Sequence, residues 1–153
     1  MIDESVASGP VCRSLLGLAL GDCLGAGVEG MRADDIRAVY GEVRDFRHRP
    51  MVWTDDTQQA LTLIEATARF GYPDPRWIAE RWAEMAQARI HRGTGRGFRG
   101  AVEEYTRTRD PSRSGRTDRV GNGAAMRIGP SAVALRSLPD EEFVDRLVGR
   151  VVS

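Results

Sequence analysis

The chain has 153 residues, and its 22 Lys and Arg residues are balanced by 22 Asp and Glu residues. This length allows one compact domain with a hydrophobic core, which we expect over residues 1–153. Balanced charge predicts no general attraction to nucleic acid or to a membrane surface. The cysteines Cys12 and Cys23 lack metal-site spacing, which favours a reduced, cytoplasmic setting. Charges and glycines interrupt the apolar run at residues 11–28, so we expect neither signal peptide nor membrane span.

The hydrophobic pattern predicts an all-α fold, with no alternating strand, internal repeat or domain boundary. A buried helix is expected over about residues 10–24. Three of its glycines lie four residues apart, so they share a face that would let another helix approach closely. These are Gly17, Gly21 and Gly25.

Further helices are expected over residues 33–40 and 55–70. Gly71 is a suitable stop for the second of them. Asp74 and Pro75 then open the next helix as its cap and first-turn proline. The apolar face expected for residues 55–70 consists of Ala60, Leu61, Ile64, Thr67 and Ala68.

The segment 91–100 is glycine-rich and basic, and a helix is expected after it with Phe98, Val102 and Tyr105 facing inward. Residues 107–119 are polar and predict an exposed loop. The remaining chain predicts helical structure over residues 121–138, broken near Gly129 and Pro130, and a last amphipathic helix over residues 140–151.

The segment from Trp53 to Thr57 is the most informative stretch, because Asp55 and Asp56 stand between the hydroxyls of Thr54 and Thr57. Such a cluster of hard oxygen donors suits Mg²⁺ or Mn²⁺. The alternative is an ordinary helix start, since Thr and Asp are preferred caps and acids in the first turn complement the helix dipole.

Two other carboxylates are candidates. Asp22 lies in an apolar stretch, so it needs either hydrogen bonds or a nearby cation, because an unpaired buried carboxylate is too costly. Glu29 follows the expected end of the first helix, where a carboxylate could enter a cleft; plain exposure to solvent is the alternative.

Two glycine-rich segments precede helices, at residues 92–97 and 121–127. Free backbone N–H groups at a helix start bind phosphate well, which makes the first segment a candidate diphosphate loop. A flexible connection and a tight turn are the respective alternatives. The segments 25–29, 53–57, 91–97 and 121–127 would together form one cleft for a metal and a diphosphate.

In this order, four motifs resemble the ADP-ribosylglycohydrolase family, which includes the dinitrogenase reductase-activating glycohydrolases. The matching residues are Gly21-Asp-Cys-Leu-Gly-Ala-Gly-Val-Glu29, Trp53-Thr-Asp-Asp-Thr57, Arg92-Gly-Thr-Gly-Arg-Gly97 and Gly121-Asn-Gly-Ala-Ala-Met-Arg127.

The resemblance implies an all-helical fold with two divalent ions, Mg²⁺ or Mn²⁺, at the bottom of an ADP-ribose cleft. It implies Thr54, Asp55 and Asp56 as metal ligands, and Glu29 with the two aspartates as catalytic residues. The implied substrate-binding residues are Gly93, Gly95, Gly97, Gly121, Asn122 and Gly123.

The sequence departs from the family in two places. Arg119 and Val120 stand where some members have a Ser-Tyr pair, and no Asp-x-Asp-Thr motif follows Arg127 to supply the remaining ligands. We therefore expect an N-terminal portion of the family fold, with exposed apolar faces that favour self-association. The two candidate faces are the glycine face of the first helix and the patch of Val144, Leu147, Val148 and Val151 on the last helix.

The leading hypothesis is a metal-dependent hydrolase that cleaves the glycosidic bond between ADP-ribose and an acceptor. The alternatives are an inactive ADP-ribose-binding module and a fragment that needs a second chain. Arginine, serine, a nucleic-acid end and a small compound all stay open as the acceptor.

Overall fold

The computed structural model describes residues 9–46, 51–116, 118 and 121–147, and within these residues the chain forms eight helices and no strand. The expected all-α class is confirmed. No helix among them is long and apolar enough to cross a membrane. In chain order they are α2 (Pro10–Gly25), α3 (Ala33–Tyr40), α4 (Asp55–Phe70), α5 (Pro75–Gln87), α6 (Arg96–Thr108), α7 (Pro111–Ser114), α8 (Gly123–Leu135) and α9 (Asp140–Leu147).

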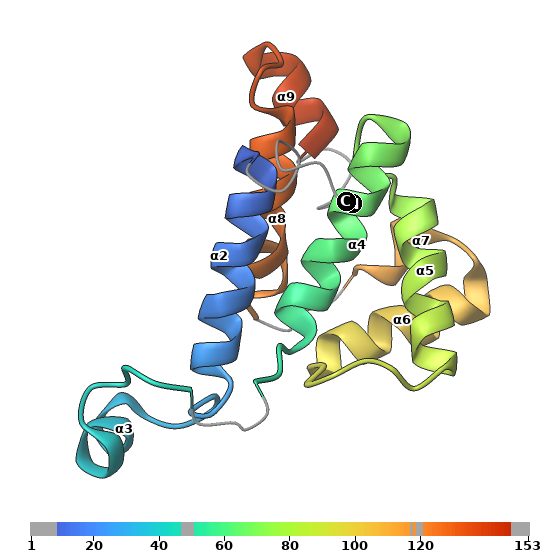
Figure 1. Cartoon of the computed structure of the whole chain (residues 1–153). Coiled ribbons are helices and arrows are strands. Elements are labelled where there is room, and N and C mark those ends of the chain that lie inside the picture. The colour runs from blue at the N-terminus through green and yellow to red at the C-terminus, as the bar shows by residue number, and fades with distance from the viewer. Residues whose placement is uncertain (1–8, 47–50, 117, 119–120, 148–153) are drawn as a thin grey trace.

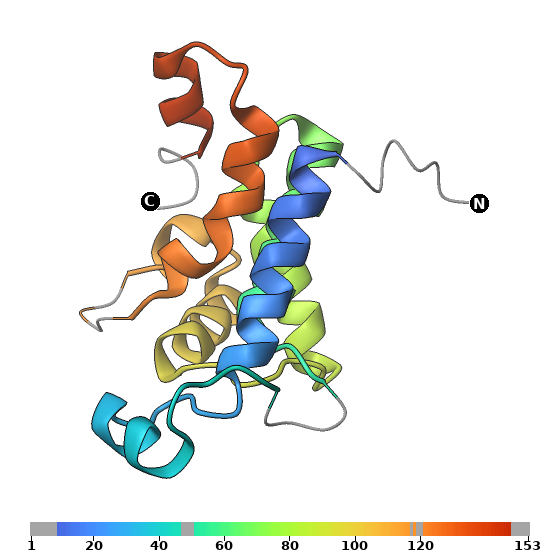
Figure 2. The ribbon, with the colours of Figure 1, turned by 60° about the vertical axis from the view of Figure 1, so that its left-hand side comes forward.

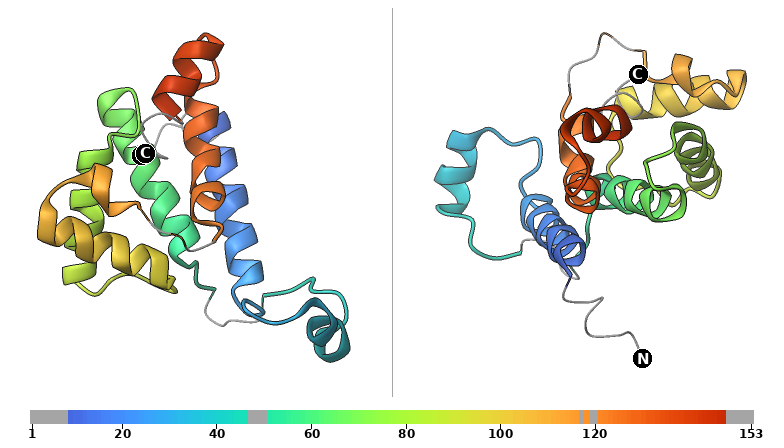
Figure 3. Two further views of the ribbon diagram at one scale, coloured as in Figure 1. Left: turned by 180° about the vertical axis from the view of Figure 1, so that it is seen from behind. Right: turned by 90° about the horizontal axis from the view of Figure 1, so that it is seen from above.

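Helix α4 is the central element of the fold. It packs against α2 and α8 on one side, as Figures 1 and 2 show, and against α5 on the other. Helices α6 and α7 complete the α5 side, and α9 packs on the end of α8. Among the described helices, α3 takes part in none of the main contacts, and the view from above shows it displaced to one side (Figure 3).

The predicted bounds of α4 agree with the structure, and both ends have clear causes. Thr54 is the N-cap, and Gly71 ends the helix in the left-handed region at φ 78°, where glycine has no steric penalty. The predicted apolar face is wrong in part. Ala60 and Thr67 are buried, but Leu61 and Ala68 are exposed. Leu63 and Ala66, which were not predicted, are buried.

The hydrophobic core consists of two small clusters joined by Trp82 of α5. One contains Leu63, Ala66 and Ile78, and the other contains Ala83, Val102 and Tyr105. The inward positions predicted for Val102 and Tyr105 are thus confirmed. This core fixes α5 and α6 beside α4, and so it fixes the loop that joins them near the start of α4.

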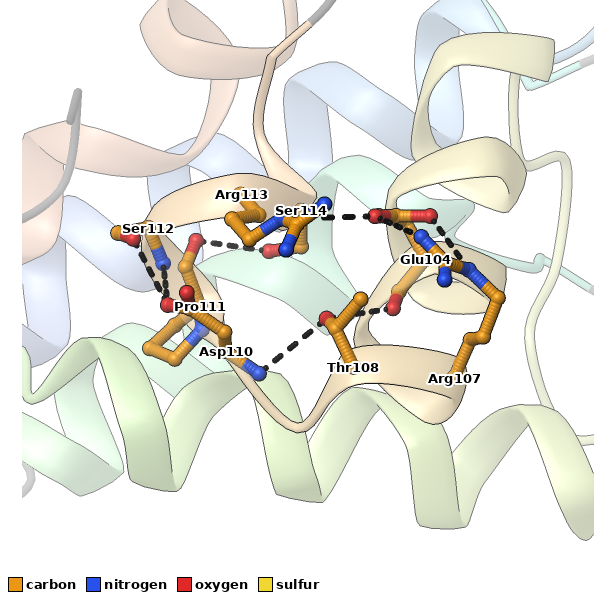
Figure 4. A network of polar contacts seen from close by, with 8 residues as sticks. All are labelled: Glu104, Arg107, Thr108, Asp110, Pro111, Ser112, Arg113 and Ser114. Atoms are coloured by element: carbon orange, nitrogen blue, oxygen red, sulfur yellow. Dashed lines mark hydrogen bonds and ion pairs between the residues drawn. The ribbon is translucent and has the colours of Figure 1, made fainter.

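The predicted loop at residues 107–119 contains a one-turn helix, α7. Asp110 accepts hydrogen bonds from the backbone N–H and the hydroxyl of Ser112, at 3.0 and 2.7 Å (Figure 4). Pro111 follows in the first helical position. The same Asp-Pro chemistry starts α5, where Asp74 accepts from the N–H of Trp77 at 2.8 Å.

The break predicted near Gly129 and Pro130 does not occur, because α8 continues through both residues. A proline inside a helix removes one backbone hydrogen bond and costs about 3 kcal/mol or more. Pro130 and Ser131 are fully buried, and α8 lies against α4 and α2. Packing against these two helices therefore offsets the lost bond.

Helix α2 is less buried than predicted, and no described residue packs closely on its glycine face, which is the exposure that we expected for this face. Cys23 is its one buried residue, whereas Leu16 and Leu20 are each 55% exposed. A Cβ on any of its three spaced glycines would have nothing within 4 Å. Helices α4 and α8 pack on the other side of α2. The side of α2 that carries Leu16, Leu20 and the three spaced glycines is therefore exposed to solvent.

Candidate functional site

The start of α4 is fastened to the end of α2 by a single side chain, Asp22. The Oδ2 atom of Asp22 accepts hydrogen bonds from the backbone N–H groups of Thr54 and Thr57, at 2.8 and 3.2 Å. It also accepts the hydroxyl of Thr57 at 2.6 Å, and Oδ1 accepts the hydroxyl of Thr54 at 2.8 Å. The partners that a carboxylate requires in this apolar stretch are therefore provided by the Thr-Asp-Asp-Thr turn.

Asp55 is buried, with 7% of its surface exposed, and it is held by a second set of contacts. The Gln59 amide, one turn later on α4, donates to Asp55 Oδ2 at 2.8 Å. Gln59 in turn accepts a hydrogen bond of 2.6 Å from Arg127 of α8. The Arg127 guanidinium lies 4.8 Å from the ring centroid of Trp82, a cation–π distance.

Several acidic side chains lie near one another at the start of α4, and burial, together with their negative charges, raises the pKa values of the two aspartates. Burial raises the pKa of Asp55, and the charges of Asp56, Glu29 and Asp22 raise it further. Burial, followed by the charges of Asp22 and Glu29, also raises the pKa of Asp56. Burial lowers the pKa of Arg127, against the opposing effect of Asp55. A site of this kind favours a cation.

The glycine-rich loop lies directly against the acidic turn. A Cβ on Gly93, whose φ is +71°, would stand 3.5 Å from both Asp55 Oδ1 and Thr54 Cβ. The side chain of Gln58 holds the loop there, because it donates to the Ile90 carbonyl at 2.8 Å and accepts from the Arg92 N–H at 3.0 Å. The positive φ and this close approach explain a glycine at position 93.

One pocket of about 620 Å³ joins the four segments. Its lining comes mainly from the start of α4, the loop before α6, the inner faces of α5 and α6, and the start of α8. Figure 1 shows the start of α4 at the lower end of this helix. The candidate residues that line the pocket are Glu29, Asp55, Asp56, Gly93, Gly95, Gly97, Gly121, Asn122 and Gly123.

One predicted residue lies differently from the rest. Thr54 does not line the pocket, and its hydroxyl is directed at Asp22. The neighbouring His91 packs edge-on against Phe98 and forms a hydrogen bond of 3.1 Å with the Trp82 carbonyl.

The sequence interpretation missed Gln58, Gln59 and the part that Arg127 takes. Helical spacing was a usable signal for Gln59, because residues four apart share a helix face. Arg127 stands within the quoted Gly-Asn-Gly motif, but nothing local indicates that it reaches across to α4. Contacts between distant helices depend on packing, which a motif does not encode.

The oxygen donors present fit a hard divalent cation in kind, since Asp55 and Asp56 are carboxylates in a pocket with raised pKa values. They do not form a complete set. Among the described residues, no three His, Cys, Asp or Glu side chains are grouped as a metal site. Mg²⁺ prefers about six oxygens, so water and substrate oxygens would have to complete the coordination of one ion.

Comparison with known proteins shows the family of the chain. Residues 9–151 match the family model described as ADP-ribosylglycohydrolase. The chain is 36% identical, over 135 residues, to the ADP-ribosyl-dinitrogen reductase glycohydrolase of Rhodospirillum rubrum, a match that covers 82% of this chain and 45% of the relative.

The chain is also 30% identical to the ADP-ribosylarginine hydrolase Tri1 of Serratia proteamaculans, which matches 95% of this chain and 42% of Tri1. A solved structure titled ADP-ribosylglycohydrolase-related protein complex superposes with a TM-score of 0.69 at 36% identity, over 91% of this chain and 47% of that one. The chain thus spans less than half the length of these relatives.

Proposed function

Because the chain belongs to the ADP-ribosylglycohydrolase family, we propose that it provides the acidic and glycine-rich part of a site for metal-dependent cleavage of ADP-ribose from an acceptor. The observation that carries this proposal is the shared pocket of about 620 Å³. It places Glu29, Asp55 and Asp56 together with the glycine segments 93–97 and 121–123.

In this proposal the oxygen atoms of Thr54, Asp55 and Asp56 would hold Mg²⁺ or Mn²⁺. When bound, such an ion supplies Lewis acidity for hydrolysis near neutral pH. Asp55 is suited to the role because Gln59 engages its Oδ2 and leaves Oδ1 on the side of Gly93. Gln59 and Arg127 therefore fix the orientation of the carboxylate.

The glycine segments would bind the diphosphate. Helix α6 starts at Arg96, and its N-cap Gly95 offers no side chain to the first backbone N–H groups. These groups and the positive end of the helix dipole suit an anion. Helix α8 starts at Gly123, and the side chain of its N-cap residue, Asn122, forms no capping hydrogen bond with the first backbone N–H groups.

Hydrolysis adds the oxygen of water to the anomeric carbon of the ribose and breaks the bond from that carbon to the acceptor. One proton of the water ends on the departing acceptor. We assign this proton transfer to Glu29, which is exposed on the turn after α2 and lines the pocket.

One observation favours a second function, an ADP-ribose-binding module without turnover. The described residues provide no third acidic ligand beside Asp55 and Asp56. A weakly held ion would permit binding of the diphosphate and ribose without efficient chemistry. A second chain that supplies the missing ligands would restore the hydrolase.

Two measurements on the whole chain test these functions. Calorimetric titration with Mn²⁺ should show binding that Asp55→Ala weakens at least about tenfold, or 1.4 kcal/mol, whereas Asp34→Ala on exposed α3 leaves it unchanged. Chromatography measures whether ADP-ribose is released from ADP-ribosylated arginine or serine peptides, with slow release expected at most. ADP-ribose binding without release supports the binding module, and no binding of either Mn²⁺ or ADP-ribose contradicts both functions.

A further inference from the structure

Asp22 has an unusual set of partners, because the four hydrogen bonds from the turn reach it across a sequence gap of more than thirty residues. Two come from backbone N–H groups and two from hydroxyls, and all four belong to Thr54 and Thr57. The arrangement does more than cap a helix, since Thr54 already acts as the N-cap of α4.

The direction of each bond follows from the chemistry of the groups. A carboxylate has only acceptor lone pairs, and a backbone N–H can only donate. The hydroxyl of Thr54 must therefore donate its one proton to Asp22 Oδ1, at 2.8 Å. This leaves the lone pairs of Thr54 Oγ1 directed away from Asp22, where the Asp56 N–H at 3.5 Å is a long and weak partner.

We propose that Asp22 is a positioning residue, which turns the Thr54 hydroxyl so that its lone pair, and not its proton, is offered to a divalent cation held by Asp55 and Asp56. This inference rests on the proposed function. A cation attracts an oxygen lone pair and repels a hydroxyl proton, so the direction of the Thr54 bond decides whether this oxygen can act as a ligand.

The substitution Asp22→Asn separates this role from simple support of the helix start. The carbonyl oxygen of Asn can take the place of Oδ2 and accept the Thr54 and Thr57 backbone bonds. Its amide group would then face Thr54 Oγ1 and donate to it. The threonine would have to accept, and its own proton would point outward. The substitution therefore keeps the shape of the side chain at position 22 and reverses the direction of its hydrogen bond with Thr54 Oγ1.

The experiment is a double-mutant cycle on the whole chain, with Mn²⁺ affinity measured by calorimetry and thermal unfolding followed without added metal. Asp22→Asn and Thr54→Val should each weaken Mn²⁺ binding at least about tenfold. The double variant should bind no more weakly than Thr54→Val alone, because Asp22 acts through that hydroxyl. Thr67→Val is the control, since its buried hydroxyl donates to the Leu63 carbonyl on the same helix; it should lower the melting temperature and leave Mn²⁺ affinity unchanged.

Equal Mn²⁺ affinity in Asp22→Asn and wild type would overturn the inference and leave the proposed function standing. Losses that multiply in the double variant would overturn it as well, since Asp22 would then act independently of Thr54. An Asp22→Asn chain that is unfolded without metal would show a role in the fold only, and would count against the inference. If the wild type binds no Mn²⁺, the proposed function fails and the inference fails with it.

Discussion

Negative charge is concentrated on four residues of the pocket region: Asp22, Glu29, Asp55 and Asp56. Each of the two aspartates on α4 has a raised pKa, caused first by burial and then by the neighbouring acids. A carboxyl group with a raised pKa in the folded chain costs stability when it is ionised. The cost is present above the folded pKa and vanishes as the pH falls below the ordinary carboxyl pKa. The fold therefore carries a penalty that a bound cation would relieve.

Removing one of these charges should stabilise the chain in the absence of metal. Asp56→Asn should raise the melting temperature near neutral pH by about 2–4 °C for each kcal/mol of repulsion relieved, and the gain should shrink in acid. Differential scanning calorimetry of the variant and the wild type, near neutral pH and in acid, measures the two melting temperatures.

Glu65→Gln, on the exposed side of the same helix, is the matched control for Asp56→Asn and should change neither the melting temperature nor Mn²⁺ affinity. The Asp56 variant should bind Mn²⁺ more weakly than wild type. A lower melting temperature for Asp56→Asn would contradict this account of the charges.

Single residues were predictable where chemistry is local. Asp22 needed a partner because of the apolar stretch around it, and Asp74 and Gly71 were recognisable as a cap and a stop. The partners themselves were not predictable. Asp22 meets Thr54 and Thr57 only because α2 and α4 pack side by side.

At the level of the helices, the loop between α5 and α6 is the element that brings glycine to the acidic turn. Gln58 ties the loop to α4 through Ile90 and Arg92, and Gly97 lies in the first turn of α6 and lines the pocket. A side chain at position 97 would therefore reach into the space assigned to the diphosphate.

Gly97→Val should weaken ADP-ribose binding at least about tenfold, because its methyl groups cover backbone N–H groups at the helix start. Gly100→Val on the same helix is the control, since Gly100 is exposed, does not line this pocket and has nothing within 4 Å of an added Cβ. Calorimetry gives the affinities and circular dichroism checks the helix content. If Gly97→Val binds ADP-ribose as tightly as Gly100→Val and the wild type do, the loop is only a connection.

Helix positions were largely predictable, and helix faces less so. The bounds of α3 and α4 agree with the sequence interpretation, because periodicity, caps and stops act within one helix. The face of α4 was misjudged because Gln59 and Thr62 are buried while Leu61 is exposed. The assumption that apolar residues lie inside fails on a helix that also forms the wall of a polar pocket.

For the whole molecule, several large apolar side chains are exposed, and those on α2 and α9 bear on self-association. Leu16 and Leu20 stand on the open face of α2, and Val144 of α9 is 53% exposed. Leu147 of the same predicted patch is buried, and Val148 and Val151 lie outside the described residues. The expected exposure is thus found on α2 and at one position of α9. Large exposed apolar patches favour association.

The isolated chain should therefore associate at micromolar concentration, and it should be weak or inactive as a hydrolase. Light scattering should show a mass above that of the monomer. Leu16→Glu with Leu20→Glu should reduce the association, whereas Val39→Glu, at an exposed position of α3, should not. A monomeric wild-type chain with rapid turnover would contradict this prediction.

The convergence of distant segments was proposed from the glycines and oxygen donors at several helix starts, and the resemblance to a family strengthened this proposal. Residues 29, 55, 93 and 122 are separated by long stretches of chain, and no local pattern specifies that they line one pocket. The order of the motifs, which matches the family, supported that expectation. The continuous path of α8 through Pro130 and the open glycine face of α2 depend on packing, and neither follows from periodicity.

The most direct test of the account is a nuclear magnetic resonance titration of the isotopically labelled chain with ADP-ribose in the presence of Mg²⁺. We expect amide shifts concentrated in three segments that line the pocket, residues 54–59, 93–98 and 121–127, with α3 unaffected. Mg²⁺ alone should shift only the first of these segments. Saturable binding whose shifts avoid all three segments, or no binding at millimolar ADP-ribose, would contradict the claim that this pocket is an ADP-ribose site.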